Sequence, residues 1–143
     1  MFSFDQIAFA SPDYAAAVAL RRAVLRAPLG LDFTTEQLAT EYGDLHLGAF
    51  DEGALVGVVI LTPHDERAFK LRQMAVSDAA RGQGVGARLL LAAETEARRR
   101  GGVRIVLEAR LTAQAFYARY GYAPQGEVFT QVTLPHILMT KAI

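Results

Sequence analysis

The stretch Arg81-Gly82-Gln83-Gly84-Val85-Gly86 carries the clearest chemical signal in the sequence. Three closely spaced glycines leave a turn almost without side chains, so its backbone N–H groups can approach a ligand. The turn lies between a strand-like run, 69–76, and a helix-like run, 85–100. The first N–H groups of a helix are unpaired and carry partial positive charge. A strand, a glycine turn and a helix N-terminus in this order predict a site for the phosphate groups of a cofactor.

Two other interpretations of the glycine loop stay open from the residues alone. Glycine-rich turns join strands to helices in many proteins that bind nothing there. A nucleotide-binding protein of another class would also use such a loop. Against that class, no Gly-Lys-Ser/Thr follows, as a P-loop requires, and the Gly-x-Gly-x-Gly spacing differs from the dinucleotide fingerprint.

The composition limits the classes of function. The chain has 143 residues, of which 52% are hydrophobic, enough for one domain with one core. Lys+Arg and Asp+Glu are equal at 15 each, so no general positive field indicates nucleic acid or an anionic membrane as a partner. The absence of cysteine excludes disulfides, a thiolate nucleophile and a Cys-ligated zinc site. No spacing of His, Asp and Glu suggests a metal, and no signal peptide is visible, so we expect a cytoplasmic protein.

The elements that must position the loop can be read from periodicity and turn residues. We expect strands at 2–10, 45–50, 54–61, 69–76 and 103–107, and a final hairpin of 126–132 and 137–143 with Leu134-Pro135 at its bend. We expect helices from an N-cap at Ser11 to Pro28, from Thr34 or Thr35, over 85–100, and from a cap at Thr112 to Gly121. Hairpins come first and strand–helix–strand units follow, which predicts an α+β, α/β-like domain around one sheet.

Two motifs resemble those of the GNAT superfamily of N-acetyltransferases. Arg81-x-x-Gly84-x-Gly86 matches the family's Q/R-x-x-G-x-G/A loop, and Phe116-Tyr117-Ala118-Arg119-Tyr120-Gly121-Tyr122 is similar to its F-Y-x-x-x-G-F/Y segment. The ending Pro135-His136-Ile137-Leu138-Met139 resembles a bacterial branch that includes ElaA-like proteins. The resemblance covers nearly the whole chain. It implies a single N-acetyltransferase domain over 1–143, with a mixed, mostly antiparallel sheet, a splay between strands 4 and 5, and about four flanking helices.

The resemblance also implies acetyl-CoA as the acetyl donor. The backbone of Arg81, Gly82, Gln83, Gly84, Val85, Gly86 and Ala87 would then hold the pyrophosphate. The backbone of Met74, Ala75 and Val76 would pair with the pantetheine arm, much as a sheet edge accepts an added strand. Arg81 and Arg88 would either add charge near the phosphates or be solvated arginines.

Tyr117 is the best candidate for a catalytic side chain. The family commonly has a tyrosine here, and a phenol near the sulfur can protonate the leaving thiolate. The alternative is that Tyr117 packs in the apolar stripe of its helix. Glu108 and His136 are candidates for the general base, with Glu127 as a further alternative. Both residues have a non-catalytic alternative. Glu108 would form an ion pair with an arginine, and His136 would be a turn residue that hydrogen-bonds the backbone. Arg110 stands near the place where many relatives carry an asparagine.

These expectations combine into one function and one alternative. We expect an N-acetyltransferase that moves the acetyl group of acetyl-CoA to the primary amine of a small molecule or peptide by direct attack. The alternative is a non-catalytic acyl-CoA-binding or sensing module of the same fold. Residues 25–41 and 127–136 are expected to contact the acceptor, whose identity is not encoded in a readable motif. Four acids in or beside the first segment would suit a cationic amine or would be solvated: Asp32, Glu36, Glu41 and Asp44. Family members are often dimers, so the resemblance makes a homodimer an expectation.

Overall fold

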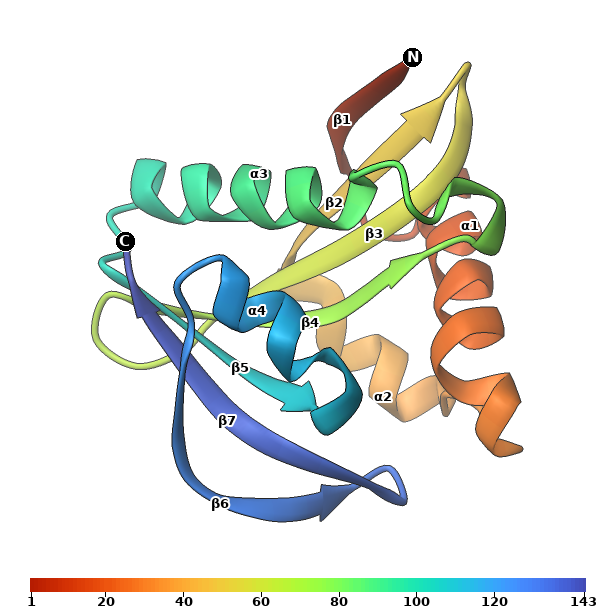
Figure 1. Cartoon of the computed structure of the whole chain (residues 1–143). Coiled ribbons are helices and arrows are strands. Elements are labelled where there is room, and N and C mark those ends of the chain that lie inside the picture. Colours follow the sequence, from red (N-terminus) through yellow and green to blue (C-terminus); the bar gives the residue numbers. More distant parts are fainter.

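The molecule is organised around one seven-stranded sheet with the order β1-β2-β3-β4-β5-β7-β6 (Figure 1). The computed structural model describes residues 1–143. The strands are β1 (Phe2–Ile7), β2 (Leu45–Asp51), β3 (Ala54–Pro63), β4 (Ala68–Val76), β5 (Arg104–Arg110), β6 (Ala123–Gln131) and β7 (Leu134–Ala142). All neighbouring strands are antiparallel except β4 and β5, which are parallel. The predicted mixed, mostly antiparallel sheet is confirmed.

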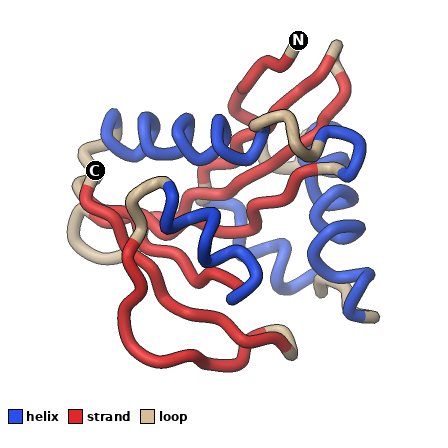
Figure 2. Tube along the Cα trace, in the orientation of Figure 1, coloured by secondary structure: helices blue, strands red, loops and turns tan.

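Four α-helices cover the two faces of the sheet (Figure 2). They are α1 (Pro12–Arg21), α2 (Thr35–Ala39), α3 (Val85–Arg99) and α4 (Gln114–Arg119). The larger core cluster, of 19 buried residues, joins α3 and α4 to one face through residues such as Val59 and Leu89. The smaller cluster, of 6, joins α1 to the other face through Val18 and Val58. Because Val58 and Val59 point to opposite faces, β3 is apolar throughout, as its sequence predicts. No helix combines the length and the apolar character needed to cross a membrane.

The strands β4 and β5 separate halfway along their length. Their pairing runs from Ala68 opposite Arg104 to Leu71 opposite Leu107 and ends there. Beyond that point β4 continues to Val76 beside β3, and β5 continues to Arg110 beside β7. The short helix α4 crosses in front of the opening (Figure 1). The predicted splay is thus confirmed, and it leaves the β5-facing edge of β4 without a strand partner.

The start of α1 is formed by the residues that the sequence suggested. The Ser11 hydroxyl accepts a hydrogen bond from the Tyr14 N–H at 3.1 Å, and Pro12 occupies the first turn. The regular α-helix ends at Arg21, earlier than the expected break at Pro28. A π-helical turn over Arg22–Arg26 and a 3₁₀ turn over Ala27–Leu29 carry the chain on to Pro28 and beyond. The helical segment is therefore as long as expected, but its last part is irregular.

Two expectations near the C-terminus are wrong. Thr112 does not cap α4, because it lies within a 3₁₀ turn, Leu111–Ala113, and α4 begins after Ala113 without a side-chain cap. The final hairpin turns at Val132 and Thr133, which have φ values of 50° and 63°, and not at Leu134-Pro135. A two-residue turn of this kind favours Asn and Gly, so Val-Thr gives no sign of it in the sequence. Pro135 instead lies in β7, opposite Thr130.

Candidate active site

The glycine loop presents a row of free backbone donors. After β4, a 3₁₀ turn over Asp78–Ala80 leads into the loop, where Gly82 and Gly84 have φ values of +76° and +78° that other residues rarely adopt. The helix α3 begins at Val85 with no side-chain cap. No backbone N–H from Gly82 to Ala87 donates a hydrogen bond within the protein. This row of donors at the start of a long helix is suited to an anion with several oxygens.

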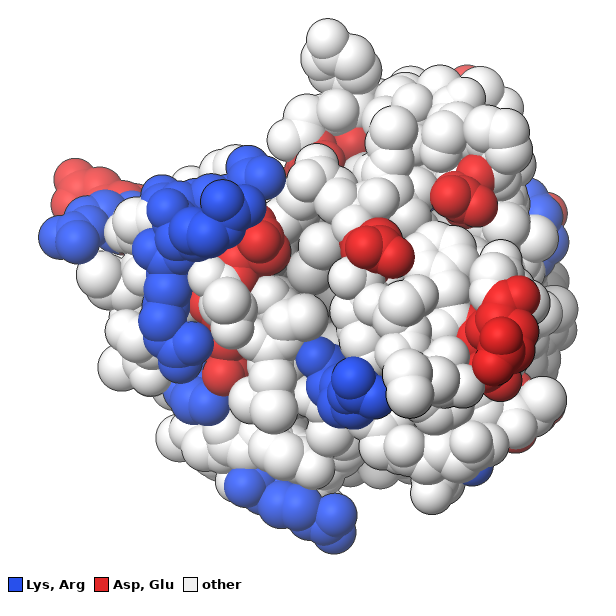
Figure 3. All heavy atoms as spheres, turned by 90° about the horizontal axis from the view of Figure 1, so that it is seen from above, with Lys and Arg blue, Asp and Glu red and all other residues white.

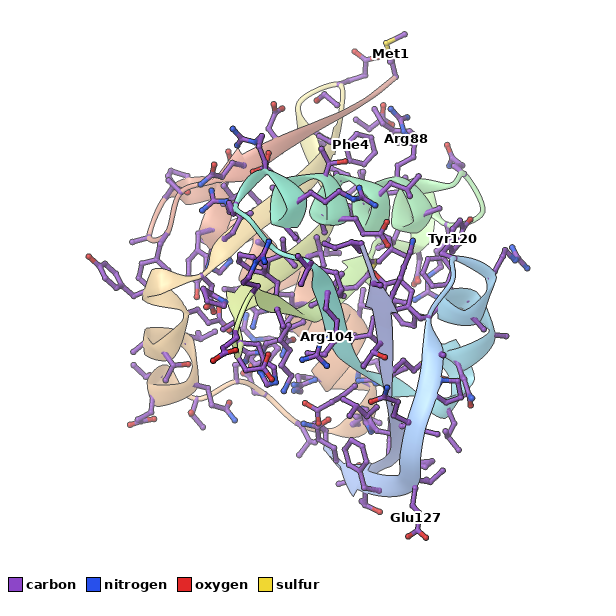
Figure 4. The ribbon with its side chains drawn as sticks, turned by 90° about the vertical axis from the view of Figure 1, so that its left-hand side faces the viewer. Met1, Phe4, Arg88, Arg104, Tyr120 and Glu127 are labelled. Atoms are coloured by element: carbon purple, nitrogen blue, oxygen red, sulfur yellow. The ribbon has the colours of Figure 1, made fainter.

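Local positive side chains add little to this site. The exposed Arg81 guanidinium pairs with Asp78 at 3.2 Å. Arg88 lies over the ring of Phe4 on β1, 4.4 Å from its centroid, and is directed toward that strand (Figure 4). Seen from above, the largest group of Lys and Arg side chains lies on the left of the molecule, the side on which α3 ends in Figure 1, and a smaller group lies near the middle (Figure 3). Anion recognition by the loop would therefore depend chiefly on the backbone.

Around Gly86, three elements come close to one another. A Cβ atom placed on Gly86 would lie 3.6 Å from Phe116 on α4, 3.8 Å from Val76 and 3.9 Å from Met74 on β4. The chain of β4 bulges at Gln73, where φ is 58° and the register with β3 shifts. The unpaired edge of β4 therefore runs from this bulge toward the glycine loop. Ala75 lies on the same strand and is buried against α1.

The splay opens into a cavity of about 550 Å³. Its wall includes Tyr117 from α4, Glu108 from β5 and His136 from β7. These are the three residues that the sequence proposed for catalysis, and the fold brings them together although 28 positions separate the first and last of them along the chain (108 to 136). The cavity is also lined by parts of both segments expected to contact the acceptor, including Phe33 and Gln131.

Tyr117 combines a packed ring with an unengaged hydroxyl. Its ring contacts those of Phe116 and Tyr122, with centroids 5.1 and 5.9 Å away, and only 8% of the residue is exposed. The hydroxyl forms no hydrogen bond with another protein group, and burial raises the pKa of Tyr117 to about 12. Tyr117 therefore packs in the core, as the alternative to a catalytic role predicts, and it also forms part of the cavity wall.

The two candidate bases have different surroundings. Glu108 forms an ion pair with Lys70 of β4, so its partner is a lysine where an arginine was considered. His136 is buried and stacks on Phe129, with ring centroids 6.0 Å apart. The His136 Nδ1 atom lies 2.9 Å from the Leu134 carbonyl oxygen, which can only accept, so Nδ1 carries the proton. In the neutral ring Nε2 is then free to accept a proton.

Glu127 is not part of this site. It is exposed on β6 and points away from the molecule (Figure 4). Among the four acids considered for the acceptor region, Asp32 and Glu36 are exposed, and Asp32 pairs with Arg22 at 2.6 Å. Glu41 is buried and lines the cavity, but Arg21 binds both of its oxygens. The cavity therefore does not have the acidic lining that a cationic amine would favour.

Sequence reasoning did not anticipate the cations of the cavity wall. The cavity is lined by four basic side chains, those of Arg26, Lys70, Arg72 and Arg110. In the sequence, Arg110 is marked only as a departure from a family asparagine, whereas in the structure its guanidinium donates a hydrogen bond to the Leu25 carbonyl oxygen at 2.8 Å. A pairing of residues so distant along the chain leaves no local pattern that could have revealed it.

The comparisons with known proteins agree with the fold and the loop. A family model described as "Acetyltransferase (GNAT) domain" matches residues 28–143. The chain belongs to this family. The resemblance that the glycine loop and the Phe-Tyr segment suggested is therefore confirmed.

Individual relatives extend this result. The uncharacterized N-acetyltransferase YitI of Bacillus subtilis is 30% identical over 108 residues, which cover 71% of this chain and 72% of YitI. An acyl-CoA N-acyltransferase from Pseudomonas aeruginosa has a similar structure, with a TM-score of 0.83, 27% identity, and coverage of 99% of this chain and 100% of that chain. ElaA from Escherichia coli shares the fold, with a TM-score of 0.82, 23% identity and 99% of each chain covered.

Proposed function

We propose that this protein is an N-acetyltransferase that moves an acetyl group from acetyl-CoA to the primary amine of a small molecule. The observation that supports this most strongly is the continuity of the site. The free N–H groups of the glycine loop, the unpaired edge of β4 and the cavity with Tyr117, Glu108 and His136 follow one another along the splay. GNAT proteins use acetyl-CoA as the donor.

The free backbone groups fit the two polar parts of this donor. The N–H groups from Gly82 to Ala87 would bind the pyrophosphate oxygens, and Arg81, which pairs with Asp78, would add little charge. The open edge of β4 at Met74, Ala75 and Val76 would hydrogen-bond the amides of the pantetheine arm. When bound, acetyl-CoA supplies an activated acyl carbon and a thiolate leaving group.

In this proposal Tyr117 acts as the general acid. Because burial raises its pKa to about 12, the phenol stays protonated at any ordinary working pH. Its Oη atom is free of protein hydrogen bonds and can give its proton to the departing sulfur. The proton returns to Tyr117 from solvent after the products leave.

Glu108 or His136 would accept the proton that the acceptor amine loses. Glu108 lies one residue beyond Leu107, the last β5 residue paired with β4, and so stands at the mouth of the splay. His136 lies opposite Arg110 in the β5–β7 pairing and offers Nε2. We assign the role to Glu108 first, because it lies nearer to the end of the free β4 edge.

Calorimetric titration with acetyl-CoA, followed by an assay of thiol release with a panel of amines, tests the proposal. We expect saturable binding near one to one and amine-dependent release of free CoA. Binding without transfer to any amine would favour the non-catalytic sensing module. Absence of binding would contradict the proposed function altogether.

A further inference from the structure

Two arginines from distant parts of the chain meet on the cavity wall. Arg26, at the end of the π-helical turn that follows α1, donates a hydrogen bond to the Leu25 carbonyl oxygen at 3.2 Å. Arg110, the last residue of β5, donates to the same oxygen at 2.8 Å. Both side chains are half-buried and line the cavity. A shared acceptor atom thus holds two guanidinium groups next to each other.

Neither arginine has a carboxylate partner. The nearby acids are already engaged: Arg21 and Tyr14 bind Glu41, Lys70 pairs with Glu108, and Arg72 lies 3.6 Å from Asp44. Arg26 and Arg110 form no ion pair with any acid of the chain. They are therefore the two cations of the cavity wall whose charge the protein leaves uncompensated.

The environment of this pair favours the arrival of an anion. Burial lowers the pKa of Arg26, and the neighbouring positive charges of Arg110 and Arg21 lower it further. Burial likewise lowers the pKa of Arg110. The Arg26 guanidinium also lies over the Phe33 ring, 4.5 Å from its centroid, which fixes its position. Two cations that lie close together, are partly desolvated and are held in place are stabilised electrostatically by an anionic ligand.

We propose that the acceptor amine also carries a carboxylate, and that Arg26 and Arg110 bind this carboxylate while Tyr117 and its neighbours act on the amine end. Arginine forks match the two oxygens of a carboxylate. Each guanidinium gives only one N–H group to Leu25, so further N–H groups remain for the oxygens of a carboxylate. A cavity of about 550 Å³ accommodates a molecule of the size of an amino acid. This inference rests on the proposed function, whose acceptor it narrows to amino acids.

Binding of reaction products tests the inference without requiring turnover. Each N-acetyl amino acid is compared with the acetylated amine that lacks only its carboxylate, for example N-acetylphenylalanine with N-acetylphenethylamine. Pairs with apolar, polar, acidic and basic side chains, and one pair with the amine at the far end of the chain, cover the class. We expect the carboxylate to tighten binding roughly ten- to a hundredfold in at least one pair. A ratio near one in every pair would overturn the inference.

Substitutions of Arg26 and Arg110 test whether these two residues cause the preference for a carboxylate. Arg26→Gln and Arg110→Gln keep a donor for the Leu25 oxygen but remove the charge, and each should reduce the carboxylate preference toward one. Arg26→Lys should retain part of it. Arg99→Gln is the matched control, because Arg99 is exposed on α3 and pairs with Glu96. Preference that persists in both Gln variants would contradict the assignment, as would tighter binding of an aminoalkyl phosphonate than of the matching carboxylate.

Acetyl-CoA titration of the same variants separates this inference from the proposed function. If all variants bind acetyl-CoA like the wild type, while the carboxylate preference is lost in the two Gln variants and kept in Arg99→Gln, both the proposed function and this inference are supported. If acetyl-CoA does not bind at all, the proposed function fails, whereas the product pairs still report on the two arginines. If acetyl-CoA binds and amines are acetylated without regard to a carboxylate, only the inference fails.

Discussion

Arg21 and Glu41 form a buried, doubly hydrogen-bonded ion pair at the wall of the cavity, which Glu41 lines. The Arg21 Nη1 and Nη2 atoms lie 2.8 and 2.7 Å from the two Glu41 oxygens, and the Tyr14 hydroxyl donates to the same carboxylate. Burial alone would raise the pKa of Glu41, but the hydrogen bonds and charge of Arg21 outweigh burial and lower it. The pair ties the end of α1 to the segment after α2, and so fixes the loop that forms one wall of the cavity.

Removing one member of this pair should strongly destabilise the fold. Glu41→Gln leaves the Arg21 charge buried without compensation, which costs about 3–5 kcal/mol in the free energy of unfolding, measured with urea. Asp65→Asn serves as the control, because it breaks the exposed Arg104–Asp65 pair and should cost less than about 1 kcal/mol. The double variant Arg21→Met, Glu41→Leu should recover much of the loss. Equal stability of Glu41→Gln and the wild type would contradict the buried-pair description.

Replacement of Tyr117 by phenylalanine should separate turnover from binding. The ring packing is retained and only the proton donor is lost, so we expect kcat to fall about a hundredfold with acetyl-CoA affinity unchanged. Tyr120→Phe, on the same helical segment and outside the cavity lining, is the matched control and should keep its activity. Full turnover by Tyr117→Phe would remove this residue from the mechanism.

Burial of the Tyr117 phenol predicts that the stability of the fold depends on pH, and Tyr117→Phe provides the comparison. The folded state binds the Tyr117 proton more tightly than the unfolded chain, because burial raises the pKa from 10.0 to about 12. The resulting contribution is fully present below about pH 10 and is lost as the pH rises toward 12. Between pH 10 and pH 12 the wild type should therefore lose about 2 kcal/mol relative to Tyr117→Phe. Parallel stability curves for the two proteins in denaturant at pH 9, 10, 11 and 12 would contradict a buried phenol.

A side chain at Gly84 should interfere with the donor's phosphates. The φ of +78° strains any other residue, although a Cβ there would meet no atom within 4 Å. Gly84→Val should weaken acetyl-CoA binding by about tenfold or more, since the adjacent N–H groups lose their alignment. Gly53→Val is the control, because Gly53 has a similar φ of +83° and equally open surroundings in the β2–β3 turn. If both variants bind acetyl-CoA equally, the loop is not the phosphate site.

Two further variants decide between the candidate bases. If Glu108 accepts the amine proton, Glu108→Gln should lower kcat by about a hundredfold, whereas His136→Gln should have a much smaller effect. Glutamine at 136 can still donate to the Leu134 oxygen, which preserves the local strand geometry. Lys70→Met controls for the loss of the ion pair by itself. The opposite order of effects would transfer the role to His136.

Features that depend on a few neighbouring residues could be predicted from the sequence. The Ser11 cap, the glycine loop before α3 and the Phe116-Tyr117 segment all act through the backbone within one or two turns, so their residue types are legible in the sequence. The glycine loop and the Phe116-Tyr117 segment were sufficient to indicate the family, and the continuous apolar run of β3 indicated that this strand is buried on both faces. The turn at Val132-Thr133 shows the limit of such signals, because the pairing of Gln131 with Leu134 closes a two-residue turn whose positive φ values these residues do not favour.

The pairing of charged side chains, in contrast, follows from the tertiary structure. Glu108 faces Lys70 because β4 and β5 are parallel neighbours, and Arg110 reaches Leu25, 85 positions away, because β5 ends where the π-helical turn after α1 passes. Such contacts follow from strand order and from the point at which β4 and β5 separate. Neither leaves a periodic pattern in the chain, because the energy of an ion pair depends on distance in space and on burial and not on sequence separation. The cationic wall of the cavity, and with it the inferred class of acceptor, emerges only from the folded chain.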